Sequence, residues 1–199
     1  MLISKFDNLN IEKCIYEFEI KYNFTFPDSY KKLLNKYNGG DTPDTSFKIN
    51  KISSDLLGFF GFSKARESLN YALLENMKII EGYVSNGVIP IGMNSFGDMI
   101  LIGITENNND NIFFVYHDRK SKYILLSEKL CDFISKCKSK KIGHIRSIEE
   151  RKQGMIDNGL EDEITEELIS DWQKEIDKYG SMKQEKVILW KTTFAMIIL

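Results

Sequence analysis

Side chains able to catalyse a proton transfer at neutral pH are scarce in this sequence. The 199 residues include two histidines, His117 and His144, which lie far apart in the chain. His117 is followed by Asp118, and a histidine oriented by a carboxylate can serve as a general base. The same pair also fits the end of a β-strand, where polar side chains form local hydrogen bonds. We expect this second case and no enzymatic activity, and we keep hydrolysis by His117 and Asp118 as the catalytic alternative.

Residue types that bind metals, phosphates or cofactors form no recognisable pattern. The three cysteines, Cys14, Cys131 and Cys137, include no CxxC pair, and neither histidine has partners at metal-site spacing. No glycine-rich phosphate-binding motif is present. We therefore expect free thiols, no metal and no cofactor. Free thiols are typical of a reducing compartment, which predicts a cytoplasmic protein.

Acidic residues are concentrated in one part of the chain. The net charge is −2, which gives no argument for direct nucleic-acid binding. A basic linker at 138–146 precedes residues 147–179, which hold eleven acids against four lysines and arginines. The most compact group of acids is Glu161, Asp162, Glu163, Glu166 and Glu167. Because such a surface can attract and cover the basic cleft of a nuclease, we predict that these residues bind a partner. The alternative is that they only face solvent and the first turn of a helix.

A turn at 94–98 contains a further candidate for partner contact. Its residues Phe96-Gly97-Asp98 suit a β-hairpin, in which Gly97 permits a positive φ. We predict that the carboxylate of Asp98 contacts a partner. The alternative is that these residues only form the turn.

Four helices are predicted within residues 1–138. Asn10 is a good N-cap for a first helix, and Pro27 and Asn38 suit the start and end of a second. The link between these two helices is short, which predicts a packed helical hairpin. A third helix is predicted over 63–81, and a fourth begins after Ser127 as its N-cap.

Strands are predicted between these helices. One is expected over 47–52, and an irregular core segment over 56–62. The later strands are predicted at 88–91, 98–105, 112–117 and 123–126. Pro90 predicts a sheet edge or a strand end, whereas the continuous apolar run at 98–105 predicts a central strand. The order of helices, antiparallel strands and a helix predicts the α+β class.

The composition changes after residue 138. Ser147 and Glu150 form a capping box at the start of one helix, and a second helix is predicted from Thr165 to Tyr179. We therefore divide the chain into an α+β domain, residues 1–138, and a helical extension with a tail packed on the domain, residues 139–199.

The ordered motifs of residues 11–134 resemble the SUKH superfamily, which comprises fungal Smi/Knr-type cell-wall regulators and bacterial immunity proteins of polymorphic toxin systems. The motifs are a first helix at 11–18, Phe26-Pro27-Asp28-Ser29-Tyr30, Leu33, Leu34, Asn38-Gly39-Gly40, Ile89-Pro90-Ile91, Phe96-Gly97-Asp98, the strand at 112–118, and Phe133 and Ile134. The resemblance implies a curved, mainly antiparallel sheet with packed helices. It also implies a binding protein rather than an enzyme.

Bacterial proteins that this chain resembles are thought to bind and neutralise a toxin, often a nuclease. We therefore expect a cytoplasmic immunity protein that acts by stoichiometric, non-covalent binding to a cognate toxin. The alternative is a regulatory scaffold that binds an endogenous protein. Neither function needs a membrane or a cofactor. The extension lies outside the resemblance, so its role and the oligomeric state are left open.

Overall fold

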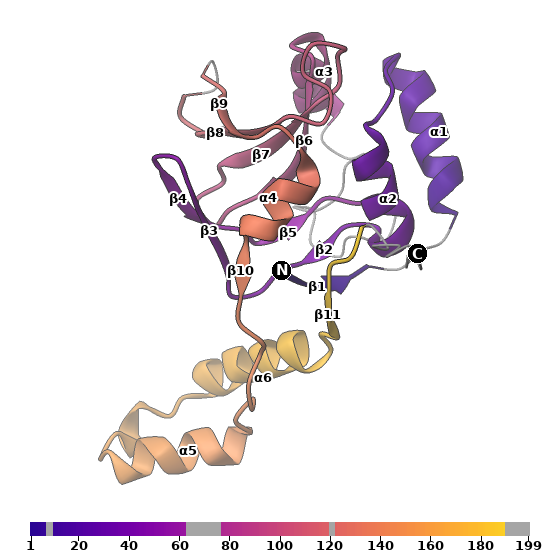
Figure 1. The fold of residues 1–199 in the computed structure, drawn as a ribbon. Coiled ribbons are helices and arrows are strands. Elements are labelled where there is room, and N and C mark those ends of the chain that lie inside the picture. The colour runs from indigo at the N-terminus through magenta and orange to yellow at the C-terminus, as the bar shows by residue number, and fades with distance from the viewer. Residues whose placement is uncertain (7–9, 63–76, 120–121, 190–199) are drawn as a thin grey trace, which may run out of the picture. The chain divides into compact units, whose positions relative to one another are not determined.

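The computed structural model describes residues 1–6, 10–62, 77–119 and 122–189 (Figure 1). Most of the helix predicted over 63–81 therefore lies outside the described residues. These described residues divide into two compact units, of which one comprises those up to 140 together with 185–189, and the other comprises residues 141–184. In sequence, the second unit is thus inserted between two segments of the first.

The helical hairpin predicted near the N-terminus is formed by α1 (Ile11–Tyr22) and α2 (Asp28–Tyr37), which lie side by side in Figure 1. Asn38 ends α2 in the left-handed conformation, with a φ of 51°. Pro27 lies one residue before the first helical residue. Asn10 precedes α1 as predicted, but it has a φ of 53° and its side chain makes no capping bond. The predicted capping bond is therefore wrong, although the helix boundary is right.

The segment after α2 packs tightly against the backbone of residues 59–62. The buried Asn38 side chain donates to the carbonyl of Phe62 at 3.0 Å and accepts from its N–H at 2.8 Å. Gly39 has a φ of 75°, and a Cβ there would lie 2.5 Å from the carbonyl oxygens of Phe59 and Phe60. The Asn-Gly pair is therefore required for packing as well as for ending the helix.

The central sheet of the first unit has the strand order β11-β1-β2-β5-β6-β7-β8-β9, and its pairings from β1 to β9 are antiparallel. The strands are β1 (Leu2–Lys5), β2 (Gly40–Asp41), β5 (Gly58–Phe59), β6 (Val88–Met93), β7 (Met99–Gly103), β8 (Ile112–Val115), β9 (Ile124–Ser127) and β11 (Gln184–Lys186). The predicted central position of the apolar strand β7, between β6 and β8, is confirmed. The predicted α+β class with mainly antiparallel strands is also confirmed.

A smaller sheet contains β10 (Lys138–Ser139), β3 (Thr45–Ile49) and β4 (Ile52–Asp55), in that order. The single strand predicted over 47–52 is wrong. Asn50 has a φ of 55°, and the chain turns there, so that β3 and β4 pair as a hairpin.

Three local predictions in the later part of this unit are also wrong. Pro90 lies in β6, which is an inner strand between β5 and β7, and a bulge between Pro90 and Gly92 interrupts the pairing with β7. Helix α3 (Met77–Ser85) continues through Gly82 and ends before Gly87, whose φ is 74°. Helix α4 (Leu130–Lys136) begins after Lys129, so Ser127 does not cap it.

The core of the first unit lies between these helices and the sheets. Its largest fully buried side chains come from α1, α2, α4, the strands and their connections: Phe18, Phe26, Tyr30, Leu33, Leu34, Tyr37, Leu56, Phe59, Phe62, Phe114 and Phe133. The residues carrying the family resemblance at 26–34 supply four members of this set. Hydrophobic burial of this extent is the main favourable contribution to folding.

After the inserted unit, the chain returns to the first unit through residues 185–188. The N–H of Val187 donates to the carbonyl of Met1 at 3.1 Å, and the Val187 side chain is buried. The Tyr37 hydroxyl accepts from the N–H of Ile188 at 2.9 Å. These contacts make the segment a structural part of the first unit.

The inserted unit is a helical hairpin of α5 (Ile148–Asp157), the short 3-10 helix η2 (Glu161–Glu163) and α6 (Glu166–Gly180). The predicted capping box of Ser147 and Glu150 is confirmed at the start of α5. Thr165 caps α6 by accepting from the N–H of Leu168 at 3.1 Å.

Candidate interaction site

The predicted contact residue Asp98 is buried in the turn between β6 and β7, with 5% of the residue exposed. Its Oδ1 accepts from the backbone N–H of His117 at 2.9 Å and lies 2.8 Å from His117 Nδ1. Its Oδ2 accepts from the side-chain amide of Asn94 at 2.9 Å. The structure therefore places Asp98 as a residue that positions its neighbours. A direct contact between this carboxylate and a partner stays a prediction.

These hydrogen bonds decide the ionisation of Asp98. Burial raises the pKa of its carboxyl. The backbone and side-chain hydrogen bonds of His117 and the bond from Asn94 lower the pKa by more than burial raises it, so that the pKa lies below the usual value. An ionised carboxylate only accepts hydrogen bonds, so Nδ1 of His117 carries a proton. The opposite ring nitrogen, Nε2, is then the acceptor of the neutral imidazole. The ring is oriented by Asp98, whereas the catalytic alternative assigned that role to Asp118.

A surface hollow adjoins this pair, which we call the His117 hollow. It has a volume of about 430 Å³ and is lined by residues 52–54 of β4, by three residues of the 94–98 turn, and by Phe114 and residues 116–119 at the end of β8. Its walls combine aromatic rings, hydroxyl groups and charged groups. Such a surface is suited to recognising another molecule.

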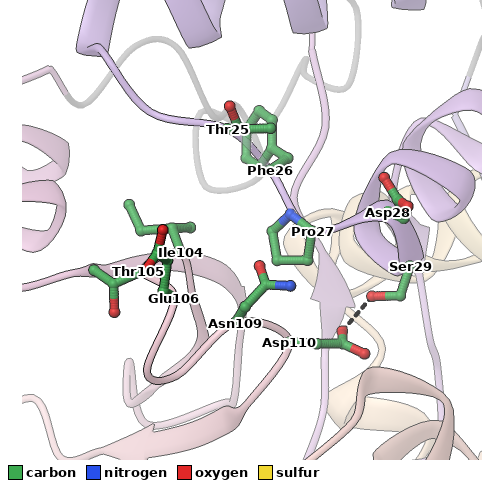
Figure 2. A pocket seen from close by; sticks show the side chains of 10 residues that line it. All are labelled: Thr25, Phe26, Pro27, Asp28, Ser29, Ile104, Thr105, Glu106, Asn109 and Asp110. Carbon is green, nitrogen blue, oxygen red and sulfur yellow. Dashed lines mark hydrogen bonds between the residues drawn. The ribbon is translucent and has the colours of Figure 1, made fainter.

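A second hollow, which we call the Pro27 hollow, has a volume of about 560 Å³. Figure 2 shows its two sides, residues 25–29 before and within the first turn of α2 and residues 104–110 after β7. The Ser29 hydroxyl donates to Oδ1 of Asp110, which also accepts from the N–H of Leu130 at 3.4 Å. Asp110 thus joins the first turns of α2 and α4.

Sequence analysis missed the role of Asp110 because its two partners are distant in the chain. The carboxylate replaces the side-chain cap that Ser127 was predicted to give to α4. An anionic group at a helix N-terminus is also favoured by the helix dipole. No local pattern around Asp110 indicates this function.

A comparison with known families decides the family of the chain. The model of the SMI1/KNR4 family (SUKH-1) matches residues 12–136, which is more than half of the chain. The chain belongs to this family. No curated protein matches it. Membership confirms the resemblance and is consistent with toxin immunity and with regulatory roles.

The family match includes both hollows of the SUKH domain but excludes the inserted hairpin. The five predicted acidic residues all lie in that hairpin and are exposed: Glu161, Asp162, Glu163, Glu166 and Glu167. The first three form η2, and the other two begin α6. The structure thus groups these five carboxylates at one connection of the hairpin, while Asp98 belongs to the SUKH domain.

The hairpin keeps its form through contacts at its surface, because no residue of α5, η2 or α6 is fully buried. The guanidinium of Arg151 donates two hydrogen bonds to the carboxylate of Glu175, at 2.9 and 3.2 Å, and lies 6.0 Å from the centre of the Trp172 ring. The bonds from Arg151 lower the pKa of Glu175. Near its ends, the N–H of Ile142 donates to the side chain of Gln184 at 2.7 Å.

Residues 1–6, 10–62, 77–119 and 122–189 contain no helix whose length and hydropathy would allow it to span a bilayer. In the same part of the chain, His, Cys, Asp and Glu side chains form no group of three or more that could hold a metal ion.

Proposed function

We propose that this protein is an immunity protein of a bacterial polymorphic toxin system, which neutralises a cognate protein toxin by binding it in the cytoplasm. Membership of the SMI1/KNR4 family supports a protein-binding role. The choice of partner rests on the charge of the inserted hairpin, where residues 147–179 hold eleven acids against four basic residues. This charge is complementary to a basic protein surface.

A nuclease is the toxin class that fits this charge best, because its substrate cleft must attract phosphates. Carboxylates at 161–163 and 166–167 would attract that cleft over several ångströms and compete with nucleic acid for its lysines and arginines. Electrostatic attraction of this kind raises association rates and weakens as salt screens the charges. Neutralisation then follows from covering the cleft.

The proposed mechanism includes no catalysis by the immunity protein. The imidazole of His117 is fixed by Asp98, and this arrangement suits recognition of a partner as well as proton transfer. Binding alone stops a toxin if the complex is long-lived and the toxin cannot release its inhibitor.

A regulatory scaffold that binds an endogenous protein is the second candidate, because the family also includes regulators. The gene neighbourhood distinguishes the two. A neighbouring gene for a secreted protein with a toxic C-terminal domain favours immunity, whereas its absence favours the scaffold.

Co-expression with the toxic domain encoded beside this gene tests the proposal. The full chain is expected to restore growth, whereas the charge reversal of Glu161→Lys with Asp162→Lys is expected to reduce protection. The matched control is Glu12→Lys with Glu128→Lys, which changes the net charge equally at two exposed positions of the SUKH domain. Equal killing with and without the wild-type chain would contradict the proposed function.

A further inference from the structure

The 94–98 turn of the His117 hollow presents an aromatic side chain to solvent on a rigid frame. Phe96 is 74% exposed. Its N–H donates to Oδ1 of Asn94 at 3.0 Å, and the N–H of Asp98 donates to the same oxygen at 2.8 Å. Ser95 donates from its N–H and its hydroxyl to the carboxylate of Asp55, each at 3.1 Å. Because these bonds already fix the backbone that carries the ring, a partner that covers Phe96 has little backbone freedom to restrict.

The hollow is also lined by a cation, Arg119, which lies near an aromatic ring. The guanidinium of Arg119 lies 5.7 Å from the centre of the Tyr116 ring. Tyr116 in turn packs edge-on against the buried Phe114, with ring centres 5.0 Å apart. Arg119 is thereby connected to the hydrophobic core through two rings. Tyrosine and arginine are among the residue types that contribute most to protein–protein binding.

His117 also lines the hollow, two positions before Arg119 in the chain. Its Nδ1 bonds to the buried carboxylate of Asp98, so the other ring nitrogen, Nε2, takes no part in that contact. The side chain is 59% exposed. The guanidinium of Arg119 presents N–H groups to a carboxylate, and the imidazole adds a second donor at Nε2 in its doubly protonated form, since a neutral ring that donates from Nδ1 has an acceptor at Nε2.

The acids around the hollow outnumber Arg119, but each of them already has a partner within the fold. Lys48 is paired across the β-hairpin with Ser53, a lining residue, so their side chains lie on the same face. The exposed acid of the rim, Asp118, lies 3.9 Å from Arg119, and both side chains are largely exposed. An exposed pair at this distance contributes little and can be exchanged for a better acceptor. The other two carboxylates, Asp98 and Asp55, already accept hydrogen bonds, Asp98 from Asn94 and His117, and Asp55 from Ser95.

We propose that the His117 hollow binds a protein segment in which an acidic side chain lies next to an apolar one. Arg119 receives the carboxylate, with His117 as a second donor in its doubly protonated form, and the apolar side chain packs against Phe96 and Tyr116. The occupant has the opposite charge to the basic partner proposed for the hairpin. This site is therefore independent of the proposed function, and a failure of one leaves the other intact.

A random peptide library displayed on phage and selected against the immobilised full-length chain tests this proposal. We expect enriched sequences with Asp or Glu next to an aromatic or aliphatic residue. Synthetic peptides of the consensus should lose affinity by about tenfold on Arg119→Ala and on Phe96→Ala, as anchor residues do. Tyr16→Ala is the matched control, because Tyr16 is a 64% exposed aromatic residue of α1 outside the hollow.

Two outcomes would overturn the proposal. One is a selection that yields no acidic consensus. The other is a consensus peptide that binds the Arg119→Ala and Phe96→Ala variants as tightly as the wild type, provided that circular dichroism shows all variants folded. His117→Gln adds a check on the acceptor, since it keeps polarity but loses the ring, and it should weaken the acidic peptide more than a peptide with Asn in place of Asp.

Discussion

Asp98 and His117, nineteen positions apart, are joined by two contacts to one carboxylate oxygen, at 2.9 Å from the backbone N–H and 2.8 Å from the ring Nδ1 of the histidine. This relationship connects the 94–98 turn to the end of β8 and fixes one wall of the His117 hollow.

Replacing Asp98 with Asn should destabilise the protein. The Asn side chain keeps one acceptor, but its NH₂ group would oppose the donor amide of Asn94 or the donors of His117. We expect a loss of about 1–3 kcal/mol in the free energy of unfolding, the usual effect for hydrogen bonds to a charged group. Chemical denaturation at neutral pH measures it, and an unchanged midpoint would contradict the assigned hydrogen bonds.

The same carboxylate predicts how stability depends on pH. The pKa of Asp98 is lower in the folded protein than its usual value, so the folded state binds this proton less readily than the unfolded state. The stabilisation is present above the unfolded pKa of about 4 and is lost as the pH falls through the folded pKa. The difference in stability between wild type and Asp98→Asn should therefore shrink in acid. A difference that stays constant from neutral pH to pH values below about 3 would contradict this.

Gly39→Ala and Gly82→Ala should change stability in opposite directions. At Gly39 the φ is 75° and a Cβ would meet two carbonyl oxygens at 2.5 Å, so we expect a loss of about 2 kcal/mol or more. At Gly82, inside α3, a Cβ meets nothing within 4 Å, and alanine should stabilise by about 0.5–1 kcal/mol. Thermal unfolding of both variants measures this. Equal shifts would show that Gly39 is not constrained as described.

Asp110 and Ser29 should be energetically coupled. Each single alanine variant removes the hydrogen bond between α2 and the loop after β7. The double variant should therefore lose less free energy of unfolding than the sum of the losses of the two single variants. A coupling energy of about 1 kcal/mol is expected from a double-mutant cycle by denaturation. Strict additivity would mean that the bond contributes nothing.

Helix ends that are set by neighbouring residues could be predicted from the sequence, whereas a helix end that is set by a distant residue could not. Asn38 and the capping box of Ser147 and Glu150 act within one helical turn, so their patterns are visible in the sequence. The cap of α4 comes from Asp110, twenty positions before Leu130. No spacing rule connects such residues, and the predicted cap, Ser127, was wrong.

In the candidate site, too, features formed by neighbouring residues were predictable and contacts between distant residues were not. The acidic group at 161–167 is contiguous, so its exposure on a hairpin could be predicted from charge and helical period. The orientation of His117 by Asp98 depends on the pairing of β7 and β8, and sequence analysis assigned the neighbouring Asp118 instead. Pro90 was misplaced because a bulge, which has no sequence pattern here, lets an inner strand accommodate it.

The hairpin should loosen when Arg151 loses its guanidinium. Arg151→Met keeps the apolar stem but removes both bonds to Glu175 and the contact with Trp172. We expect amide hydrogen exchange in α5 and α6 to become about tenfold faster, while the strands of the SUKH domain keep their protection. The control is Lys174→Met, since Lys174 forms an exposed pair with Asp171 within α6. Equal exchange rates in the two variants would contradict the role given to Arg151.

The central claim is that the acidic hairpin of this SUKH protein binds a toxin, and capture from native cell lysate and medium followed by mass spectrometry tests it most directly. The full chain serves as bait beside the Glu161→Lys/Asp162→Lys and Glu12→Lys/Glu128→Lys variants. The account predicts that wild type and the second variant retain a secreted multidomain protein with a small C-terminal toxic domain, and that the first variant loses it. Retention of only the bait itself or of housekeeping enzymes, or equal retention by all three baits, would contradict it.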